Sequence, residues 1–410
     1  MSVFLAYDIR GEYPKEINEE FAYNTGLACA KLLKSKFIIV GRDCRLSSPS
    51  LQQALMKGIT DFGVDVVDIG ICSTPLLYYA SKDAPAIMVT ASHDPKQYNG
   101  FKTVYKGGTP VSTELIQKTK GKSAKFKGEV MHSSYLDEYV KFVRQENLPK
   151  IKVVCDAGNG CSGIVIPSLF PEFIGINMAC DGNFPSHDPN PEHEKNLKQL
   201  QKKVLEVNAD IGIAYDGDCD RVFFVDEKGK KVDPSVIGAL LASAYRGKRV
   251  IYSINNGKIL KETIGIHNFA IPSRIGHFFI KKLMREKDAI FAAEPSGHYY
   301  FRENNFCDSG DMTVARVIKL MRGKKLSEAV KPFQKYYNER LTIPGTEKNV
   351  KKAASKFKNA DKTDGITVEL ENGWFNLRAS NTEPILKLFV ESDSKKAIEE
   401  IKRKVMRAAK

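Results

Sequence analysis

Short apolar runs that end abruptly in polar or glycine-rich segments recur along the chain. In the first third these runs lie at residues 36–40, 64–69 and 86–90, and their length and β-branched content are typical of buried strands. Stretches with helical spacing of apolar residues lie between them, at residues 16–34, before residue 58 and at 111–120. Because strands and helices alternate, this part of the chain is predicted to form a layered α/β domain.

The same alternation extends over two further units and then changes. Strands are expected at residues 152–155, 211–215, 250–254 and 289–292, a hairpin at 222–232, and helices at 135–143, 195–207, from 235, 258–264, 278–285 and 313–322. The last part reads helix, three strands and helix, with strands at 366–370, 374–377 and 386–390 and the final helix at 395–409. We therefore predict three α/β domains, at residues 1–148, 149–234 and 235–338, and a smaller α+β domain at 339–410.

Composition and charge describe a folded protein of several domains. A chain of 410 residues, 42% hydrophobic and 27% charged, is too long for one ordinary core. The net charge of +14 suits a small anion or nucleic acid, but the lysines are dispersed, so no nucleic-acid partner is expected.

No apolar run reaches the roughly 20 residues of a membrane span, and no secretion signal begins the sequence, so we expect a cytoplasmic protein without a membrane partner. The eight cysteines form no C-x-x-C pair, which disfavours zinc.

A polar segment with a reactive hydroxyl follows the strand expected at residues 86–90. Ser92, His93, Asp94 and Lys102 in this segment can bind phosphate or exchange protons. A proline and a glycine in the same segment favour an irregular backbone. A serine at the end of a buried strand is a candidate nucleophile, with simple packing of the loop as the alternative.

Three aspartates at alternate positions follow another expected strand. Asp216, Asp218 and Asp220 would repel one another strongly without a cation, and carboxylate oxygens are the ligands that Mg²⁺ prefers. A calcium-binding EF-hand loop is excluded because it needs glycine where this chain has Arg221. We predict a Mg²⁺ site, with an acidic surface turn as the alternative. Mg²⁺ completes its coordination with water or phosphate oxygen, so a phosphorylated Ser92 would fit beside it.

A loop near the end of the chain has the composition of a phosphate site. Arg378, Ser380, Asn381 and Thr382 supply a guanidinium, two hydroxyls and an amide within a few residues. These groups suit a second phosphate, distant in sequence from the serine. A polar hairpin turn is the alternative interpretation.

The remaining candidates carry groups that suit sugar hydroxyls or phosphate. Glu294, Ser296 and His298 form a compact set of donors and acceptors, with a satisfied polar turn as the alternative. Arg10 lies in a glycine-closed turn near the start of the chain, where an exposed turn is an equally good interpretation. His277 taken alone is more often structural than catalytic.

Taken together, the loops are similar to those of the α-D-phosphohexomutases, and within them to the phosphomannomutase/phosphoglucomutase and phosphoglucosamine mutase branches. The resemblance spans nearly the whole chain and rests on the order and spacing of residues 90–102, 216–221, 294–298 and 378–384. It implies three similar mixed-sheet α/β domains and a smaller C-terminal domain, each giving one loop to a central cleft. It also implies interconversion of hexose 1- and 6-phosphates, of mannose or glucose, through a phosphoserine and a bisphosphorylated sugar.

The resemblance gives each loop a role. Phospho-Ser92 would donate and recover the phosphoryl group, and Mg²⁺ would be bound by the phosphoserine with the three aspartates. The loop at 294–298 would recognise the sugar, and the loop at 378–382 would clamp the other phosphate. The residues expected to line the phosphoserine and substrate or to transfer protons are Arg10, His93, Lys102, Arg221, His277 and His298. The expected partner is a phosphorylated hexose, with hexose 1,6-bisphosphate as intermediate and activator, bound by a monomer or weak dimer.

One position in the sugar loop departs from the family pattern. Pro295 stands where enzymes that use both mannose and glucose usually have methionine and glucosamine enzymes have glutamine. A lysine found in some dual-specificity members is replaced near Asn255. The sequence therefore leaves phosphoglucosamine mutase as an alternative. A metal-dependent serine phosphatase is a second alternative, but it has no use for separate sugar and phosphate loops.

Overall fold

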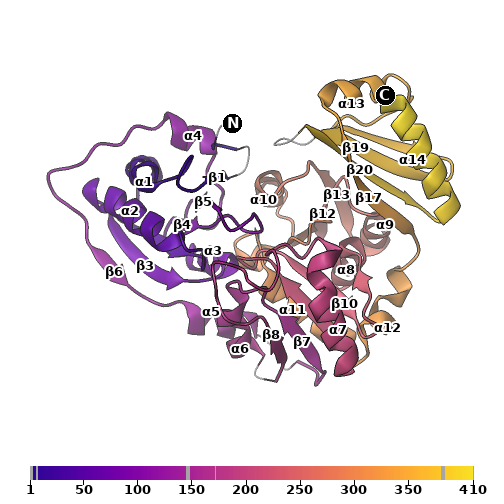
Figure 1. The fold of residues 1–410 in the computed structure, drawn as a ribbon, viewed down its shortest axis with the longest axis horizontal. Coiled ribbons are helices and arrows are strands. Elements are labelled where there is room, and N and C mark those ends of the chain that lie inside the picture. The colour runs from indigo at the N-terminus through magenta and orange to yellow at the C-terminus, as the bar shows by residue number, and fades with distance from the viewer. Residues whose placement is uncertain (1–2, 6–7, 145–147, 171, 380–383, 410) are drawn as a thin grey trace.

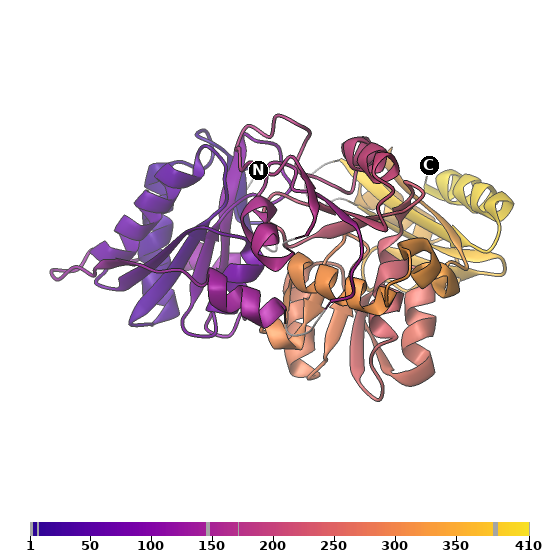
Figure 2. The same cartoon turned by 90° about the horizontal axis from the view of Figure 1, so that it is seen from below.

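The computed structural model describes residues 3–5, 8–144, 148–170, 172–379 and 384–409, which form four sheets covered by helices. We number the domains I to IV after the order of these sheets in the chain. Figure 1 shows domain I at the left and domain IV at the upper right, with domains II and III between them, and the turned view in Figure 2 keeps domains I and IV at opposite ends. The predicted fold class, three α/β domains and a smaller fourth domain, is confirmed.

Domain I is built on a six-stranded sheet in the order β1-β5-β4-β2-β3-β6. Its elements are β1 (Ile9–Glu12), α1 (Glu19–Leu33), β2 (Phe37–Arg42), α2 (Ser48–Asp61), β3 (Asp65–Ile71), α3 (Thr74–Ala80), β4 (Ala86–Val89), β5 (Tyr98–Val104), α4 (Thr113–Lys118) and β6 (Val130–His132). Helices α1 and α2 approach so closely that a Cβ at Gly26 or Gly58 would lie 2.2 or 2.1 Å from a backbone oxygen of the other helix. Glycine is required at both positions for this packing.

Domains II and III each contain a five-stranded sheet. After α5 (Leu136–Val143), domain II has β7 (Val153–Asp156), α6 (Ser162–Leu169), β8 (Ile174–Ile176), η1 (Glu194–Leu197), α7 (Lys198–Glu206), β9 (Ile211–Tyr215), β10 (Val222–Asp226) and β11 (Lys231–Val232). Domain III has α8 (Pro234–Ala242), β12 (Arg249–Ser253), α9 (Lys258–His267), β13 (Phe269–Ser273), α10 (His277–Glu286), β14 (Phe291–Ala293), β15 (Tyr299–Phe301), η2 (Arg302–Asn304), β16 (Cys307–Asp308), α11 (Gly310–Met321), α12 (Leu326–Val330) and η3 (Lys331–Phe333). The strand orders are β11-β10-β9-β7-β8 and β13-β12-β14-β15-β16.

Domain IV is an antiparallel sheet, β17-β20-β19-β18, covered by two helices. Its elements are β17 (Tyr337–Pro344), α13 (Glu347–Ala354), β18 (Ile366–Leu370), β19 (Gly373–Ala379), β20 (Ile385–Ser392) and α14 (Lys395–Ala409). The sequence predicted only three strands here. Strand β17 escaped prediction because it is an edge strand with no fully buried side chain.

The three α/β sheets share an arrangement that determines where the polar loops lie. In each sheet a strand that runs parallel to its inner neighbour is followed by an antiparallel strand beside it, as β4–β5, β9–β10 and β14–β15. The loop between the two strands therefore emerges at the same end of each sheet. These connections contain Ser92, the three aspartates and Glu294, respectively.

The apolar interior is divided unequally. One continuous cluster of buried side chains runs from domain I through domain II to domain III, and includes Ile39, Cys155 and Phe291. Domains I, II and III also have smaller clusters of their own. The described apolar side chains of domain IV form a single separate cluster, from Val350 to Ala409, which shares no residue with the large one. No described helix combines the length and apolar character that crossing a membrane requires.

Candidate active site

The segment containing Ser92 is an ordered turn held from below by a buried arginine. Arg45 is fully buried, and its guanidinium donates hydrogen bonds to four backbone carbonyls, those of Ser92, Asp94, Pro95 and Tyr98, at 2.6 to 3.0 Å. Ser92 itself has a φ of +53°, a left-handed conformation that costs a non-glycine residue energy and persists only where contacts impose it. The expected irregular segment ends sooner than predicted, because residues 98–104 form strand β5.

The Ser92 hydroxyl points into the carboxylate cluster predicted from the sequence. Its Oγ donates to Asp216 Oδ2 at 2.8 Å. Asp216, Asp218 and Asp220 are buried, and one oxygen from each lies within 4.8 Å of the others. Burial and repulsion from Asp220 and Asp218 hold the pKa of Asp216 well above its usual range. Three converging, mutually repelling carboxylates are the donor set of a hard divalent cation, so these residues fit Mg²⁺.

A lysine balances part of this negative charge. Lys102 Nζ lies 2.6 Å from Asp218 Oδ2 and also contacts Asp220. Burial alone would lower the pKa of Lys102, but Asp218 and Asp220 raise it above its usual value, so the side chain is an ammonium at neutral pH. For Asp220 burial raises the pKa, and Lys102 and His298 together hold it well below its usual range. Lys102 is thus a cation of the cluster.

Domains I and III share a second charged group beside the serine. Arg10 donates to Asp8 and to Asp94, each at 3.0 Å, and His277 Nε2 lies 3.2 Å from the other oxygen of Asp8. Burial raises the pKa of Asp8, but His277 and Arg10 lower it more, so it is held well below its usual range. The carboxylate therefore links Arg10 of the first domain to His277 of the third.

His93 is the ring nearest to the serine oxygen. Its Nδ1 lies 3.3 Å from Ser92 Oγ. Burial, and then the positive charges of Arg221 and Arg10, hold the pKa of His93 well below its usual range. A neutral ring at this distance can accept a proton from a hydroxyl or hydrogen-bond it.

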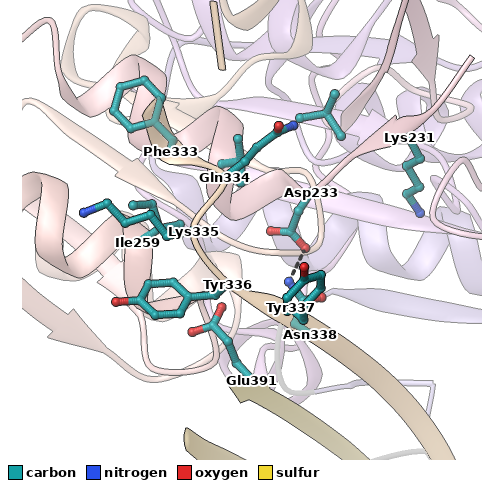
Figure 3. A pocket seen from close by; sticks show the side chains of 12 residues that line it. Lys231, Asp233, Ile259, Phe333, Gln334, Lys335, Tyr336, Tyr337, Asn338 and Glu391 are labelled. Atoms are coloured by element: carbon teal, nitrogen blue, oxygen red, sulfur yellow. Dashed lines mark hydrogen bonds between the residues drawn. The ribbon is translucent and has the colours of Figure 1, made fainter. Parts of the chain in front are cut away.

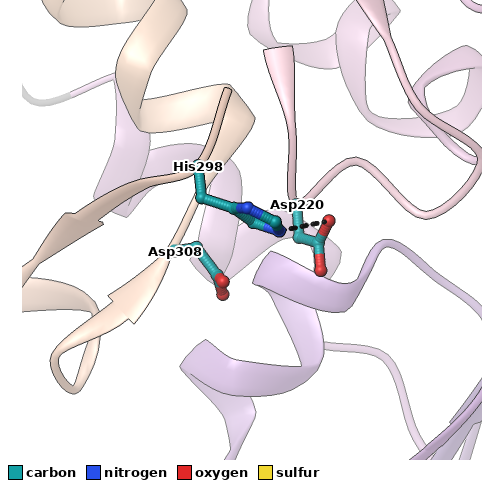
Figure 4. Close-up of side chains that lie close together, drawn as sticks. All are labelled: Asp220, His298 and Asp308. Atoms are coloured by element: carbon teal, nitrogen blue, oxygen red, sulfur yellow. Dashed lines mark ion pairs between the residues drawn. The ribbon is translucent and has the colours of Figure 1, made fainter. Parts of the chain in front are cut away.

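The expected sugar loop is joined directly to the metal loop. Arg221 and His298 form a backbone bridge, and Arg221 Nε lies 3.3 Å from His298 Nε2. The same ring nitrogen is 3.4 Å from Asp220 (Figure 4), while His298 Nδ1 is 2.9 Å from Ser296 Oγ. Glu294 accepts hydrogen bonds from the Gly276 N–H and from Tyr300. His298 therefore joins this loop to the aspartate cluster, and Ser296 contacts the same ring.

The last predicted loop is only partly described. Arg378 is half-buried near the end of β19, where it pairs across the sheet with Lys387 of β20. Ser380, Asn381 and Thr382 lie outside the described residues. Among the described site residues, those of domains I, II and III form one contiguous group, whereas Arg378 belongs to a separate domain with its own core.

Three residues that shape the site were missed by the sequence reasoning. Thr74 donates to Asp218 Oδ2 at 2.6 Å from the start of α3, Arg45 holds the serine turn, and Asp8 joins Arg10 to His277. Each follows an expected strand or neighbours a predicted residue. Their partners, however, are as many as 144 positions away in sequence, so only the fold reveals them.

Comparison with known proteins accounts for the whole chain. Four domain models described as phosphoglucomutase/phosphomannomutase match it: alpha/beta/alpha domain I at residues 1–127, domain II at 133–229, domain III at 233–336 and the C-terminal domain at 323–408. A phosphomannomutase of Salmonella montevideo is 36% identical, covering 96% of this chain and 95% of the relative. One of Methanocaldococcus jannaschii is 34% identical, covering 98% and 96%.

Solved structures agree with these matches. A phosphoglucomutase/phosphomannomutase family protein from Burkholderia thailandensis superposes with a TM-score of 0.92 at 30% identity, over 99% of this chain and 96% of the other. An N-acetylglucosamine-phosphate mutase, at 13% identity and a TM-score of 0.64 over 99% and 96% of the two chains, shares the fold. On this evidence, the chain belongs to the phosphoglucomutase/phosphomannomutase family of hexose-phosphate mutases.

Proposed function

We propose that this protein interconverts the 1- and 6-phosphates of mannose and glucose through a phosphorylated Ser92. The observation that carries the proposal is the hydrogen bond from the Ser92 hydroxyl to Asp216, a member of the buried carboxylate cluster. A hydroxyl that only packed against its loop would not need a site for a divalent cation beside it. Membership of the family supports the same reaction.

We assign one task to each domain, with the boundaries expected from the sequence. Residues 1–148 would carry the phosphoserine, 149–234 the metal ligands, 235–338 the sugar-recognition loop and 339–410 the clamp for the distal phosphate. The common position of the loops at the ends of the sheets supports this division for the first three domains.

The proposed reaction consists of two phosphoryl transfers. Phospho-Ser92 gives its phosphoryl group to the free hydroxyl of a hexose monophosphate. The bond to Ser92 Oγ breaks and a bond to the sugar oxygen forms, while the sugar hydroxyl proton passes to a base and Ser92 Oγ takes up a proton. The hexose 1,6-bisphosphate then reorients within the site, so that its other phosphate faces Ser92. Its other phosphoryl group returns to Ser92, whose hydroxyl proton passes to a base, and the sugar oxygen that it leaves takes up a proton.

The cation would be held by Asp216, Asp218, Asp220 and the phosphorylated Ser92. When bound, Mg²⁺ withdraws negative charge from the phosphoryl oxygens. Lys102 neutralises part of the charge of the aspartates and keeps them in place. Arg10 and Arg221 flank the same region and would stabilise the phosphoryl charge during transfer.

Proton transfer is assigned by distance from the serine. His93 is our first candidate for the proton acceptor because its Nδ1 lies 3.3 Å from Ser92 Oγ. His277, oriented by Asp8, and His298, oriented by Ser296, are the further candidates. Glu294 and Ser296 would bind sugar hydroxyls, and Arg378, with Ser380, Asn381 and Thr382, would bind the distal phosphate.

An assay with three sugars tests the proposal. Purified enzyme with Mg²⁺ and hexose 1,6-bisphosphate is given the 1-phosphates of mannose, glucose and glucosamine, and the 6-phosphates are measured. We expect mannose and glucose phosphates to be isomerised. Much faster turnover of glucosamine phosphate would identify a phosphoglucosamine mutase, and free phosphate without isomerised sugar would identify a phosphatase.

A cytoplasmic location, a monomer or weak dimer, and the lack of nucleic-acid and membrane partners stay predictions.

A further inference from the structure

Helix α9 of domain III begins without a side-chain cap from its own segment. Its N-cap residue is Gly257, which has no side chain to accept the free N–H groups of the first turn. Glu391, on β20 of domain IV, takes this place: its carboxylate accepts a hydrogen bond from the Lys258 N–H at 2.7 Å. A residue of one domain therefore caps a helix of another.

Glu391 is fixed firmly within its own domain. It lies directly opposite Trp374 in the β19–β20 pair, and the Trp374 indole donates to the same carboxylate oxygen at 2.8 Å. Both side chains are buried, and the indole packs on Phe389 with ring centroids 5.0 Å apart. The carboxylate therefore moves with the sheet of domain IV.

The helix end is shaped to admit this carboxylate. A Cβ at Gly257 would lie 2.6 Å from Glu391 Oε2, its tightest contact. The φ of Gly257 is −58°, which any residue can adopt. Space for Glu391, and not backbone conformation, is therefore what favours glycine here.

The rest of the junction is polar and loosely packed. Asp364 accepts from the Ile275 N–H at 3.2 Å, and Asn338 donates to Asp233 at 3.2 Å. A cavity of about 390 Å³ lies beside Glu391 (Figure 3). Burial raises the pKa of Glu391 to about 7 against the lowering effect of the Lys258 and Trp374 hydrogen bonds.

We propose that Glu391 is a positioning residue that docks domain IV on helix α9 and so sets the place of Arg378. This inference rests on the proposed function, in which Arg378 binds the distal phosphate. Arg378 lies four residues beyond Trp374 on β19, so the two side chains face the same side of the sheet, about 14 Å apart along the strand. A tilt of domain IV at the capped helix end therefore displaces Arg378 from the Ser92 group.

The chain contains its own reporter of this contact. Trp374 is the single tryptophan, and its indole hydrogen-bonds to Glu391. In Glu391→Ala the indole loses its partner and meets water, so we expect its emission maximum to shift to longer wavelength. Glu391→Gln keeps an oxygen acceptor and should retain the wild-type spectrum. Glu400→Ala, which changes an exposed glutamate on α14, is the matched control and should change nothing.

Kinetics separate positioning from a general loss of structure. We expect Glu391→Ala to raise KM for mannose 1-phosphate about fivefold, the equivalent of a lost helix cap of about 1 kcal/mol at tenfold per 1.4 kcal/mol. We expect kcat to stay within about twofold, because Glu391 touches no reacting group. Glu391→Gln should restore KM. An unshifted spectrum with unchanged KM, or a loss confined to kcat, would overturn the proposal.

If circular dichroism shows that Glu391→Ala does not fold, a second variant, Gly257→Ala, tests the same contact. Gly257→Ala keeps the Glu391 side chain but adds a Cβ 2.6 Å from Glu391 Oε2, so the carboxylate must shift away from the helix end, and we expect the same red shift and rise in KM. A wild-type spectrum and KM for Gly257→Ala would count against docking. If the wild-type protein isomerises no sugar phosphate, the proposed function fails, while the tryptophan spectra still decide whether Glu391 docks domain IV.

Discussion

The Ser92 end of the molecule and the Arg378 end are built on different principles. Around Ser92, loops of three domains meet over one continuous apolar cluster and are joined by buried charges such as Lys102 and Asp218. Arg378 stands on a sheet with its own apolar cluster, joined to domain III by a few polar contacts. The difference indicates that the group around Ser92 is preorganised, whereas the proposed phosphate clamp at Arg378 can move with its domain.

Removing the serine hydroxyl should have the largest effect. Ser92→Ala deletes the phosphoryl carrier, so we expect kcat to fall by about 10⁴-fold or more, as for other covalent catalysts that lose their nucleophile. The hydroxyl donates a single hydrogen bond to Asp216, so the melting temperature should stay close to that of the wild type. Substantial residual isomerisation by Ser92→Ala would place the chemistry elsewhere.

Removing the buried lysine should test preorganisation next. Lys102→Met leaves Asp218 and Asp220 buried without their cation, and breaking such a pair costs about 3–5 kcal/mol of unfolding free energy. Denaturant unfolding of the full-length variant and wild-type proteins measures this loss of unfolding free energy. Lys118→Ala, which removes an exposed pair with Glu114, is the control and should have no measurable effect. Equal stability of the two variants would show that the buried charges do not hold the site together.

The clamp should behave differently from the serine group. Arg378→Ala would remove the charge-assisted hydrogen bonds that we propose to the distal phosphate, each about 1.5–3 kcal/mol, so KM should rise roughly tenfold to a hundredfold. Stability should change little because Arg378 is only half-buried. Steady-state kinetics with glucose 1-phosphate measure the effect. A fall in kcat with unchanged KM would contradict a clamp.

The pH dependence of stability should be the most gradual of these effects. Burial raises the pKa of Asp311 from 3.8 to about 7, although Tyr139 donates to its carboxylate at 2.9 Å. The folded state therefore binds this proton more tightly than the unfolded chain, so its stabilisation is complete below about pH 4 and is lost as pH rises toward 7. The slope is at most about 1.4 kcal/mol per pH unit.

Thermal melting across this pH range checks the sign. Asp311→Asn keeps an acceptor for Tyr139 but cannot ionise, so the fall in melting temperature between pH 4 and 7 should become shallower. Glu391 titrates in the same window, so the profile should flatten only in part. A profile for Asp311→Asn that is as steep as the wild-type profile would contradict the assignment.

The alternation of apolar and polar segments was enough to predict the layered fold and the polar loops. It failed where buried segments carry polar residues that find partners only in the fold. Strand β5 contains two buried polar residues, Asn99 and Lys102, so its sequence resembled that of a loop. In the fold Asn99 donates to the hydroxyls of Ser47 and Ser48, and Lys102 contacts the aspartates. The domain boundaries stay a prediction.

The residues of the site likewise fall into those that the sequence predicts and those that only the fold reveals. Ser92 and Asp216 were predictable because each follows a short apolar run. Arg45 and Thr74 were not, because their contacts with the serine turn and the metal loop depend on packing between distant segments. The orientation of Glu391 toward helix α9 has no sequence signal at all, since its partner is a backbone N–H of another domain.

The central claim is that Ser92 carries the phosphoryl group between the two ends of the sugar. Its most direct test is to incubate the enzyme with hexose 1,6-bisphosphate, measure the intact mass and map the modification by peptide sequencing. We expect one added phosphate, located on Ser92, that disappears when excess hexose monophosphate is supplied and bisphosphate forms. An enzyme that isomerises hexose phosphates while Ser92 stays unmodified, or a phosphate on another residue, would contradict it.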